Sequence, residues 1–125
     1  MTRRKPPQLK IVPETPSGSP EYPEPFPFLS AYAAEEWRRL APELTKNGTL
    51  TALDFGPFAA YCEAYSAWRS ATEAMAALAA RDALTHGLLV KNGEGELVVN
   101  PLVEIARAAG DAMLGVSARI HARPR

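Results

Sequence analysis

The sequence predicts a mainly α protein: three helices, one of them long and rich in alanine, with a small β-hairpin before the last helix and a proline-rich arm at the N-terminus. Three observations lead to this prediction. Apolar residues recur every three to four positions over most of residues 29–120. Two short β-prone runs flank a glycine-bearing turn between the second and third helical segments. Prolines crowd residues 6–27 and interrupt regular structure there.

Residues 1–28 are predicted to form a flexible, basic arm. Proline donates no backbone hydrogen bond and biases the preceding residue toward extended geometry, so neither a helix nor a sheet can continue through this segment. The arm begins with bases that have no acid among them, Arg3, Arg4, Lys5 and Lys10. Its last aromatic residues either rest against an apolar surface or belong to an untethered tail, and both readings stay open: Tyr22, Phe26 and Phe28.

The first predicted helix begins after Ser30, whose side chain is a suitable N-cap. Pro42 should kink or end this helix, because it cannot donate to the carbonyl four residues earlier. Asn47 and Gly48 then supply a left-handed stop.

The second helix has the clearest start signal in the chain. Thr51 as N-cap and Asp54 at the third helical position form a capping box, and Pro57 predicts a kink or a restart near Gly56. Spacings of three and four then give one apolar stripe, expected to be core or subunit interface, at Phe58, Tyr61, Tyr65, Trp68, Thr72, Met75 and Ala79. The helix is expected to end around residues 82–86.

A hairpin is predicted over about residues 87–99, with a turn at 91–95. An isolated hairpin is marginal in water, so this one should pack on the helices or pair with another copy. Asn100 as N-cap and Pro101 at the first helical position then start the last helix. The apolar stripe of that helix is Leu102, Ile105, Ala109, Met113, Val116 and Ile120.

The residues offer little for catalysis. His86 and His121 have no acid or cysteine at a ligand spacing, and the single cysteine, Cys62, is expected to be a buried small hydrophobe. The glycine-rich stretches lack the context of a phosphate cradle, and no apolar run reaches the roughly 18 residues of a membrane span. We therefore expect a binding or assembly protein rather than an enzyme, with no cofactor, metal or membrane contact, located in the cytoplasm.

The first predicted helix carries a second group of bases, Arg38, Arg39 and Lys46. The formal net charge is zero, which excludes a uniformly basic nucleic-acid binder, but local clusters can neutralise phosphates with salt-sensitive affinity. The helix–turn–helix outline of residues 37–54 could present a helix to a DNA groove. A solvated face stays open as the alternative, because acids alternate with these bases: Glu35, Glu36 and Glu43.

Four motifs follow one another in order between residues 29 and 105. They are Leu29-Ser30 with Trp37-Arg38-Arg39-Leu40-Ala41-Pro42-Glu43-Leu44, then Gly48-Thr49-Leu50-Thr51-Ala52-Leu53-Asp54, Tyr61-Cys62-Glu63-Ala64-Tyr65, and Val99-Asn100-Pro101-Leu102. The series resembles the small-subunit family of phage terminases, of the siphophage type with cohesive-end packaging. The C-terminal end departs from the family pattern, since Gly115–Arg119 lacks the expected proline.

The resemblance implies a homo-oligomeric ring, nonamer-like in size, in the host cytoplasm. It would bind double-stranded viral DNA at packaging initiation and regulate the terminase large subunit, which hydrolyses ATP and cuts DNA. Residues 29–125 would form the oligomerisation and DNA-engaging domain. We expect DNA contacts from Arg3, Arg4, Lys5, Lys10, Arg38, Arg39 and Lys46, and subunit contacts from Tyr61, Tyr65, Trp68 and Met75. Two alternatives remain, a dimeric helix–turn–helix regulator and a structural phage adaptor without DNA affinity.

Overall fold

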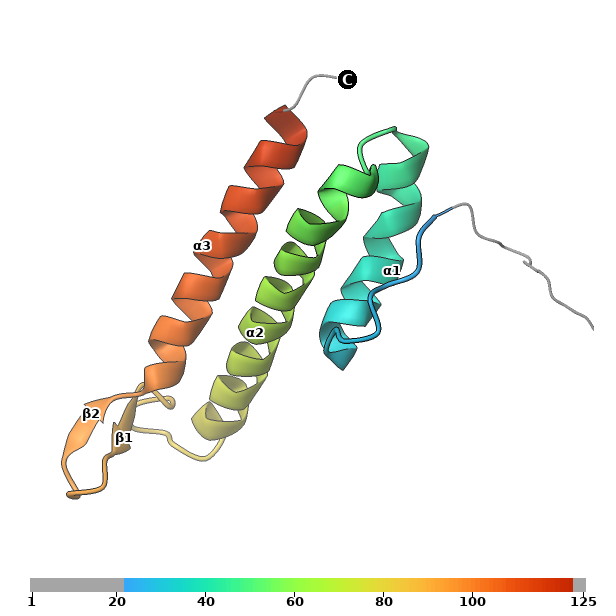
Figure 1. The fold of residues 1–125 in the computed structure, drawn as a ribbon. Coiled ribbons are helices and arrows are strands. Elements are labelled where there is room, and N and C mark those ends of the chain that lie inside the picture. The colour runs from blue at the N-terminus through green and yellow to red at the C-terminus, as the bar shows by residue number, and fades with distance from the viewer. Residues whose placement is uncertain (1–21, 123–125) are drawn as a thin grey trace, which may run out of the picture.

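The computed structural model describes residues 22–122, and their side chains as far as Ile120. The elements are α1 (Ala31–Lys46), a short 3-10 turn (Ala52–Asp54), α2 (Phe55–Ala79), β1 (Leu89–Lys91), β2 (Leu97–Val99) and α3 (Pro101–Ala122). Figure 1 shows α2 in the middle, with α3 along one side and α1 along the other. The hairpin projects from the end where α2 finishes and α3 begins. The predicted class, three helices with a hairpin before the last, is confirmed.

Helix α1 begins as predicted at the Ser30 cap, where the Ser30 hydroxyl accepts a hydrogen bond from the amide of Ala33 at 3.4 Å. It does not end at Pro42 but continues to Lys46. The missing hydrogen bond belongs to the carbonyl of Arg38, an exposed residue, so water can replace it. The helix then stops at the predicted place, where Gly48 has a φ of +72°.

The start of α2 also follows the sequence signals. The amide of Thr51 donates to the Asp54 carboxylate at 2.8 Å, which closes the predicted capping box. The chain makes one 3-10 turn and α2 begins at Phe55, close to the predicted restart at Gly56. Pro57 therefore lies in the first turn of α2, where backbone amides need no partner within the helix.

The end of α2 corrects a prediction: the helix stops at Ala79, not around residues 82–86. Beyond it, the Asp82 carboxylate accepts hydrogen bonds from the amides of Leu84, Thr85 and Gly87 at 3.2, 3.0 and 3.1 Å. These bonds hold the chain in a turn that a continuing helix could not form. No glycine or proline marks the stop, so the sequence carried no clear signal for it.

The core lies between α1 and α2 and is closed by the segment before α1. Trp37 is fully buried, its ring centroid lies 4.6 Å from that of Phe58, and its indole N–H donates to the carbonyl of Pro23 at 2.8 Å. Tyr22 and Phe26 pack against this core, so these two aromatic residues do rest on an apolar surface. Phe28 stacks on Phe26 but stays 76% exposed.

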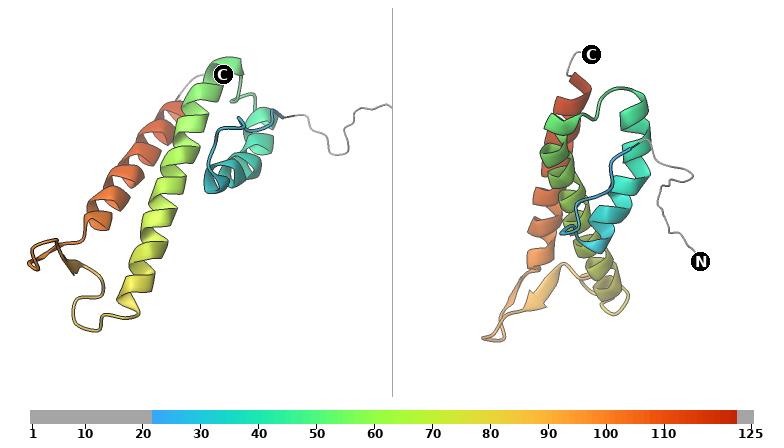
Figure 2. Two further views of the ribbon diagram at one scale, coloured as in Figure 1. Left: turned by 60° about the horizontal axis from the view of Figure 1, so that its bottom comes forward. Right: turned by 45° about the vertical axis from the view of Figure 1, so that its right-hand side comes forward.

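The contact between α2 and α3 is built from smaller side chains. Ala71 of α2 and Ala109 of α3 are buried in it, and the Trp68 ring lies over Gly110. Helix α1 reaches along α2 as far as Glu73, which accepts a hydrogen bond from Tyr32, so only the last turns of α2 extend beyond α1 (Figure 2). The core is concentrated at one end of the molecule.

The hairpin forms as predicted, with antiparallel pairs Leu89–Val99, Val90–Val98 and Lys91–Leu97. Asn100 fixes its base, because its side-chain amide donates to the Gly87 carbonyl at 2.9 Å while its carbonyl oxygen accepts from the amide of Leu102 at 3.0 Å. Asn100 thus caps α3, as predicted, and ties the hairpin to the turn after α2.

Candidate nucleic-acid interface and subunit interface

The three bases predicted on α1 are all exposed to solvent. Arg39 and Lys46 are seven residues apart and lie on one side of the helix, whereas Arg38 is turned away from Arg39 by about 100°. Arg39 forms an ion pair with Glu36 at 2.8 Å. Within residues 22–122, neither Arg38 nor Lys46 takes part in an ion pair. The structure therefore presents two unpaired cations and one paired one.

Glu36 is the most buried acid of the site, with a side chain only 1% exposed. It accepts hydrogen bonds from Nε and Nη2 of Arg39, both at 2.8 Å, and from the Tyr61 hydroxyl at 2.8 Å. Burial alone would raise the pKa of Glu36, but these hydrogen bonds outweigh it and hold the pKa below its usual value. Burial, and then the bond to Glu36, raise the pKa of Tyr61. The carboxylate thus fixes the Arg39 guanidinium, whose side chain remains 64% exposed.

The other two acids of α1 are separated by the fold. Glu35 forms an ion pair with Arg69 of α2 at 2.7 Å, so its charge is neutralised across the helix contact. Glu43 is exposed and takes part in no ion pair between residues 22 and 122. Of the three acids that alternate with the bases in sequence, only Glu43 therefore opposes Arg38 and Lys46 with an unpaired charge.

In the helix–turn–helix alternative, the first turns of α2 would have to contact base edges. The exposed positions in the turn before α2 and at its start are Thr51, Ala52, Leu53, Gly56, Pro57 and Ala60. Only Thr51 among them has a hydrogen-bonding side chain, and its hydroxyl already donates to the Asp54 carboxylate at 2.9 Å. Reading base edges in a groove requires donors or acceptors that face the DNA. The start of α2 therefore offers little for direct reading of bases.

The predicted aromatic stripe lies on the side of α2 between α1 and α3. Tyr61 and Tyr65 are half-buried, Trp68 is 39% exposed, and Met75 is half-buried near the end of the helix. Ring centroids of Tyr65 and Trp68 lie 6.2 Å apart. Much of the stripe is engaged in packing within the chain, and Trp68 keeps the largest exposed apolar area.

A cavity of about 210 Å³ opens at the N-terminal end of this stripe, beside Phe58 and Tyr61, between side chains of all three helices. Its walls are largely apolar, with Arg39 at one edge, and come from α1, α2 and the last turns of α3: Arg39, Leu40, Leu44, Phe58, Tyr61, Ser117 and Ile120. The Glu36–Arg39–Tyr61 cluster therefore borders a groove between α1 and α3.

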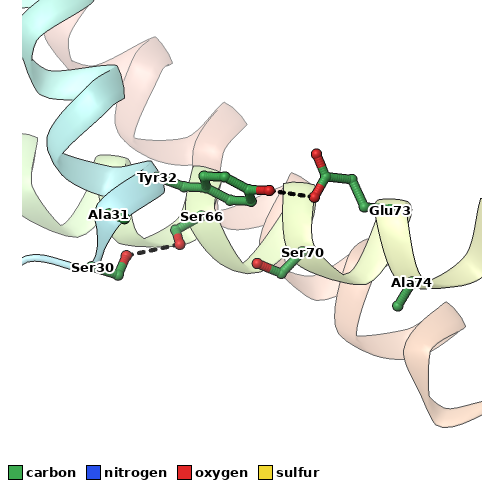
Figure 3. A pocket seen from close by; sticks show the side chains of 7 residues that line it. All are labelled: Ser30, Ala31, Tyr32, Ser66, Ser70, Glu73 and Ala74. Carbon is green, nitrogen blue, oxygen red and sulfur yellow. Dashed lines mark hydrogen bonds between the residues drawn. The ribbon is translucent and has the colours of Figure 1, made fainter.

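A second, open notch lies beneath the start of α1 (Figure 3). The Ser30 hydroxyl is 2.8 Å from that of Ser66, and the Ser30 amide donates to Glu63 at 2.7 Å, so a carboxylate from α2 faces the α1 N-terminus. Tyr32 donates to Glu73, while the Arg69 guanidinium sits 3.9 Å from the centre of the Tyr32 ring. The hydrogen bonds that Ser30 and Tyr32 make to side chains of α2 therefore join α1 to α2 at this notch.

The remaining predicted positions add no group to either interface in the described part of the chain. Arg3, Arg4, Lys5 and Lys10 lie outside the described residues. Cys62 is fully buried, as expected, and burial raises the pKa of its thiol to about 12. Between residues 22 and 122 there is no cluster of three or more histidine, cysteine or acidic side chains that could hold a metal ion. In the same range, no helix is both long and apolar enough to span a membrane.

Fold and surface together define a small, mainly helical protein with exposed bases on α1 and exposed aromatic and apolar side chains. The sequence profile of the family described as phage terminase, small subunit, matches residues 33–121, more than two thirds of the chain. The chain belongs to this family, and its role is in phage DNA packaging. No curated protein and no solved structure matches the chain.

Proposed function

We propose that this packaging subunit binds double-stranded viral DNA, assembles into a homo-oligomeric ring and regulates the ATPase and nuclease activity of the large subunit in the host cytoplasm. The observation that carries the DNA-binding part is the charge arrangement on α1. Glu36 is buried and paired with Arg39, and Glu35, although its side chain is 66% exposed, is paired with Arg69 of α2. Within residues 22–122, Arg38 and Lys46 are exposed and take part in no ion pair.

The proposed contacts are to phosphate rather than to bases. Exposed arginine and lysine side chains neutralise phosphates by releasing counterions, which gives strong salt dependence and little sequence preference. Arg39 presents the remaining edge of its guanidinium from a fixed position, because Glu36 holds Nε and Nη2. The basic N-terminal residues Arg3, Arg4, Lys5 and Lys10 would add contacts of the same kind.

Binding of a labelled duplex, titrated with salt, tests this proposal. The Arg38→Ala, Lys46→Ala double variant should lose affinity, and the slope of log affinity against log salt should fall by about 2, roughly one unit for each phosphate-binding cation removed. Arg81→Ala, at an exposed position in the turn after α2, is the matched control and should leave both quantities unchanged. Equal affinity and slope for the double variant and the wild type would remove α1 from the DNA interface.

The N-terminal arm needs a separate deletion. The deletion should stop at residue 21, because Tyr22 and Pro23 contribute to packing around Trp37. The chain lacking residues 1–21 should fold normally, judged by its helical circular dichroism, and should show a smaller salt slope. If its slope equals that of the full chain, the arm makes no DNA contact.

The proposed ring requires two contact surfaces on each subunit. In a cyclic assembly the contacts are heterologous, so each subunit must offer two different patches. The exposed edge of the aromatic stripe at Trp68, together with Leu114 one turn beyond Gly110 on α3, is one candidate patch; Leu114 is 70% exposed. Trp68→Ala should reduce the assembled mass, and an unchanged mass would remove this patch from the interface.

A further inference from the structure

The largest collection of exposed apolar side chains lies at the hairpin end, far from α1 (Figure 1). Leu97 and Val99 are each 64% exposed, and Leu84 in the turn before the hairpin is 89% exposed. Leu88, Leu89 and Ile105 in the same part of the chain are also exposed. Clusters of exposed apolar side chains that form a large contiguous patch are uncommon on monomers and usually mark an interaction surface.

The strand register places three of these side chains on one face. Leu89 is paired with Val99, and Lys91 with Leu97, so all four side chains point to the same side of the two-stranded sheet. Val90 and Val98 point to the other side and are half-buried. The outward side, which we term the hairpin face, therefore consists of Leu89, Lys91, Leu97 and Val99.

The hairpin face is held in a fixed position. Gly87 packs directly on the end of α2, so that a Cβ there would come within 3.2 Å of the Leu78 side chain. The side-chain amide of Asn100 donates to the Gly87 carbonyl. The backbone amide of Asn100 donates to the Leu88 carbonyl at 2.8 Å. A two-stranded hairpin is marginal in water by itself. A firmly anchored hairpin with an apolar outer face is therefore a preorganised contact surface.

The unpaired charges around this face disfavour DNA as its occupant. Glu94 and Glu96 flank the turn and take part in no ion pair within residues 22–122, while Lys91 lies on the face itself. Glu104 at the start of α3 is paired with Arg107 at 2.5 Å and is not among these unpaired charges. A polyanion would be repelled here, whereas a protein surface would not.

We propose that the hairpin face is an interface with a second copy of this chain, and that it supplies the second patch that the ring requires. This inference rests on the proposed self-assembly. The exposed part of the aromatic stripe offers one patch, and the hairpin face is the remaining large apolar surface in residues 22–122. A contact between two different patches of identical chains is the kind that closes a ring.

Light scattering on full-length variants tests this contact. Leu97→Glu with Val99→Glu should shift the mass from that of the assembly toward the 13.5 kDa of one chain, at unchanged helical circular dichroism. Leu53→Glu is the matched control, since Leu53 is 90% exposed at the opposite end of α2, and it should assemble normally.

A milder variant guards against misfolding. Cys62 is buried, with its pKa raised to about 12, so Leu97→Cys introduces one reactive thiol into the chain. Its alkylation should be several-fold slower in the concentrated assembly than after dilution, while alkylation of Leu53→Cys should not depend on concentration. The inference is wrong if the wild type assembles and both hairpin variants behave like their controls.

Other outcomes separate the two proposals. A wild type that stays at 13.5 kDa at every concentration overturns both the ring and the hairpin contact, while leaving DNA binding to be judged by the salt titration. If the hairpin variants assemble fully but lose binding to the large subunit, that enzyme is the occupant and a second copy is not.

Discussion

The Tyr61 hydroxyl donates a hydrogen bond to the buried carboxylate of Glu36 at 2.8 Å, across the contact between α2 and α1. Arg39 binds the same carboxylate from the solvent side. One buried acid thus joins two helices and fixes the position of an exposed cation. The arrangement couples the stability of the α1–α2 core to the shape of the proposed DNA surface.

Tyr61→Phe should destabilise the fold by about 1.5 kcal/mol, because a hydrogen bond to a charged group is removed inside the protein. Urea unfolding measures the change. Tyr65→Phe on the same helix is the control, since the Tyr65 hydroxyl has only a 3.5 Å contact with Arg69. Equal unfolding midpoints for the two variants would show that the bond to Glu36 contributes nothing measurable.

The turn after α2 should lose stability at low pH, when the Asp82 carboxylate becomes protonated. Hydrogen bonds from the Thr85 side chain, and then from the amides of Thr85 and Gly87, lower the pKa of Asp82 from 3.8 to about 2. Because the folded-state pKa is depressed, the stabilisation is complete above pH 3.8 and is lost as the pH falls through about 2. An NMR titration of the Asp82 carboxyl carbon checks this, and a midpoint near 3.8 would contradict it.

Two glycines should respond to alanine with opposite signs. A Cβ at Gly110 would meet the Trp68 ring at an ordinary 3.8 Å, so Gly110→Ala should stabilise α3 by about 0.5–1 kcal/mol. Gly87 has a φ of +82°, and a Cβ there would crowd the end of α2, so Gly87→Ala should destabilise the protein. The unfolding temperatures of the two variants, compared with that of the wild type, test this prediction. Shifts of the same sign would contradict the described packing.

The helix starts and the hairpin were predictable because their signals are local. Ser30, Thr51 with Asp54, and Asn100 each bond to backbone within three residues, so the chain segment alone determines them. Continuation of α1 through Pro42 was harder to foresee. It depends on Trp37 and Ala41 being buried against α2, which is a tertiary effect.

The candidate site was only partly visible in the sequence. The exposure of Arg38, Arg39 and Lys46 was predictable, because long charged side chains on a helix almost always face solvent. The role of Glu36 was missed, since beside Glu35 it reads as part of a solvated face. Its burial needs Tyr61, which lies 25 residues further along the chain. The apolar face of the hairpin was likewise hidden, because which side of two short strands is covered depends on how Gly87 and Asn100 anchor them.

Sedimentation of the full chain mixed with a fluorescent viral DNA duplex tests the central claim most directly, since it reports assembly and DNA engagement together. The chain should sediment as a homo-oligomer, a multiple of 13.5 kDa, and the duplex should move with it at low salt and separate as salt is raised. A 13.5 kDa monomer, with the duplex sedimenting alone at low salt, would contradict the account of a DNA-engaging packaging ring.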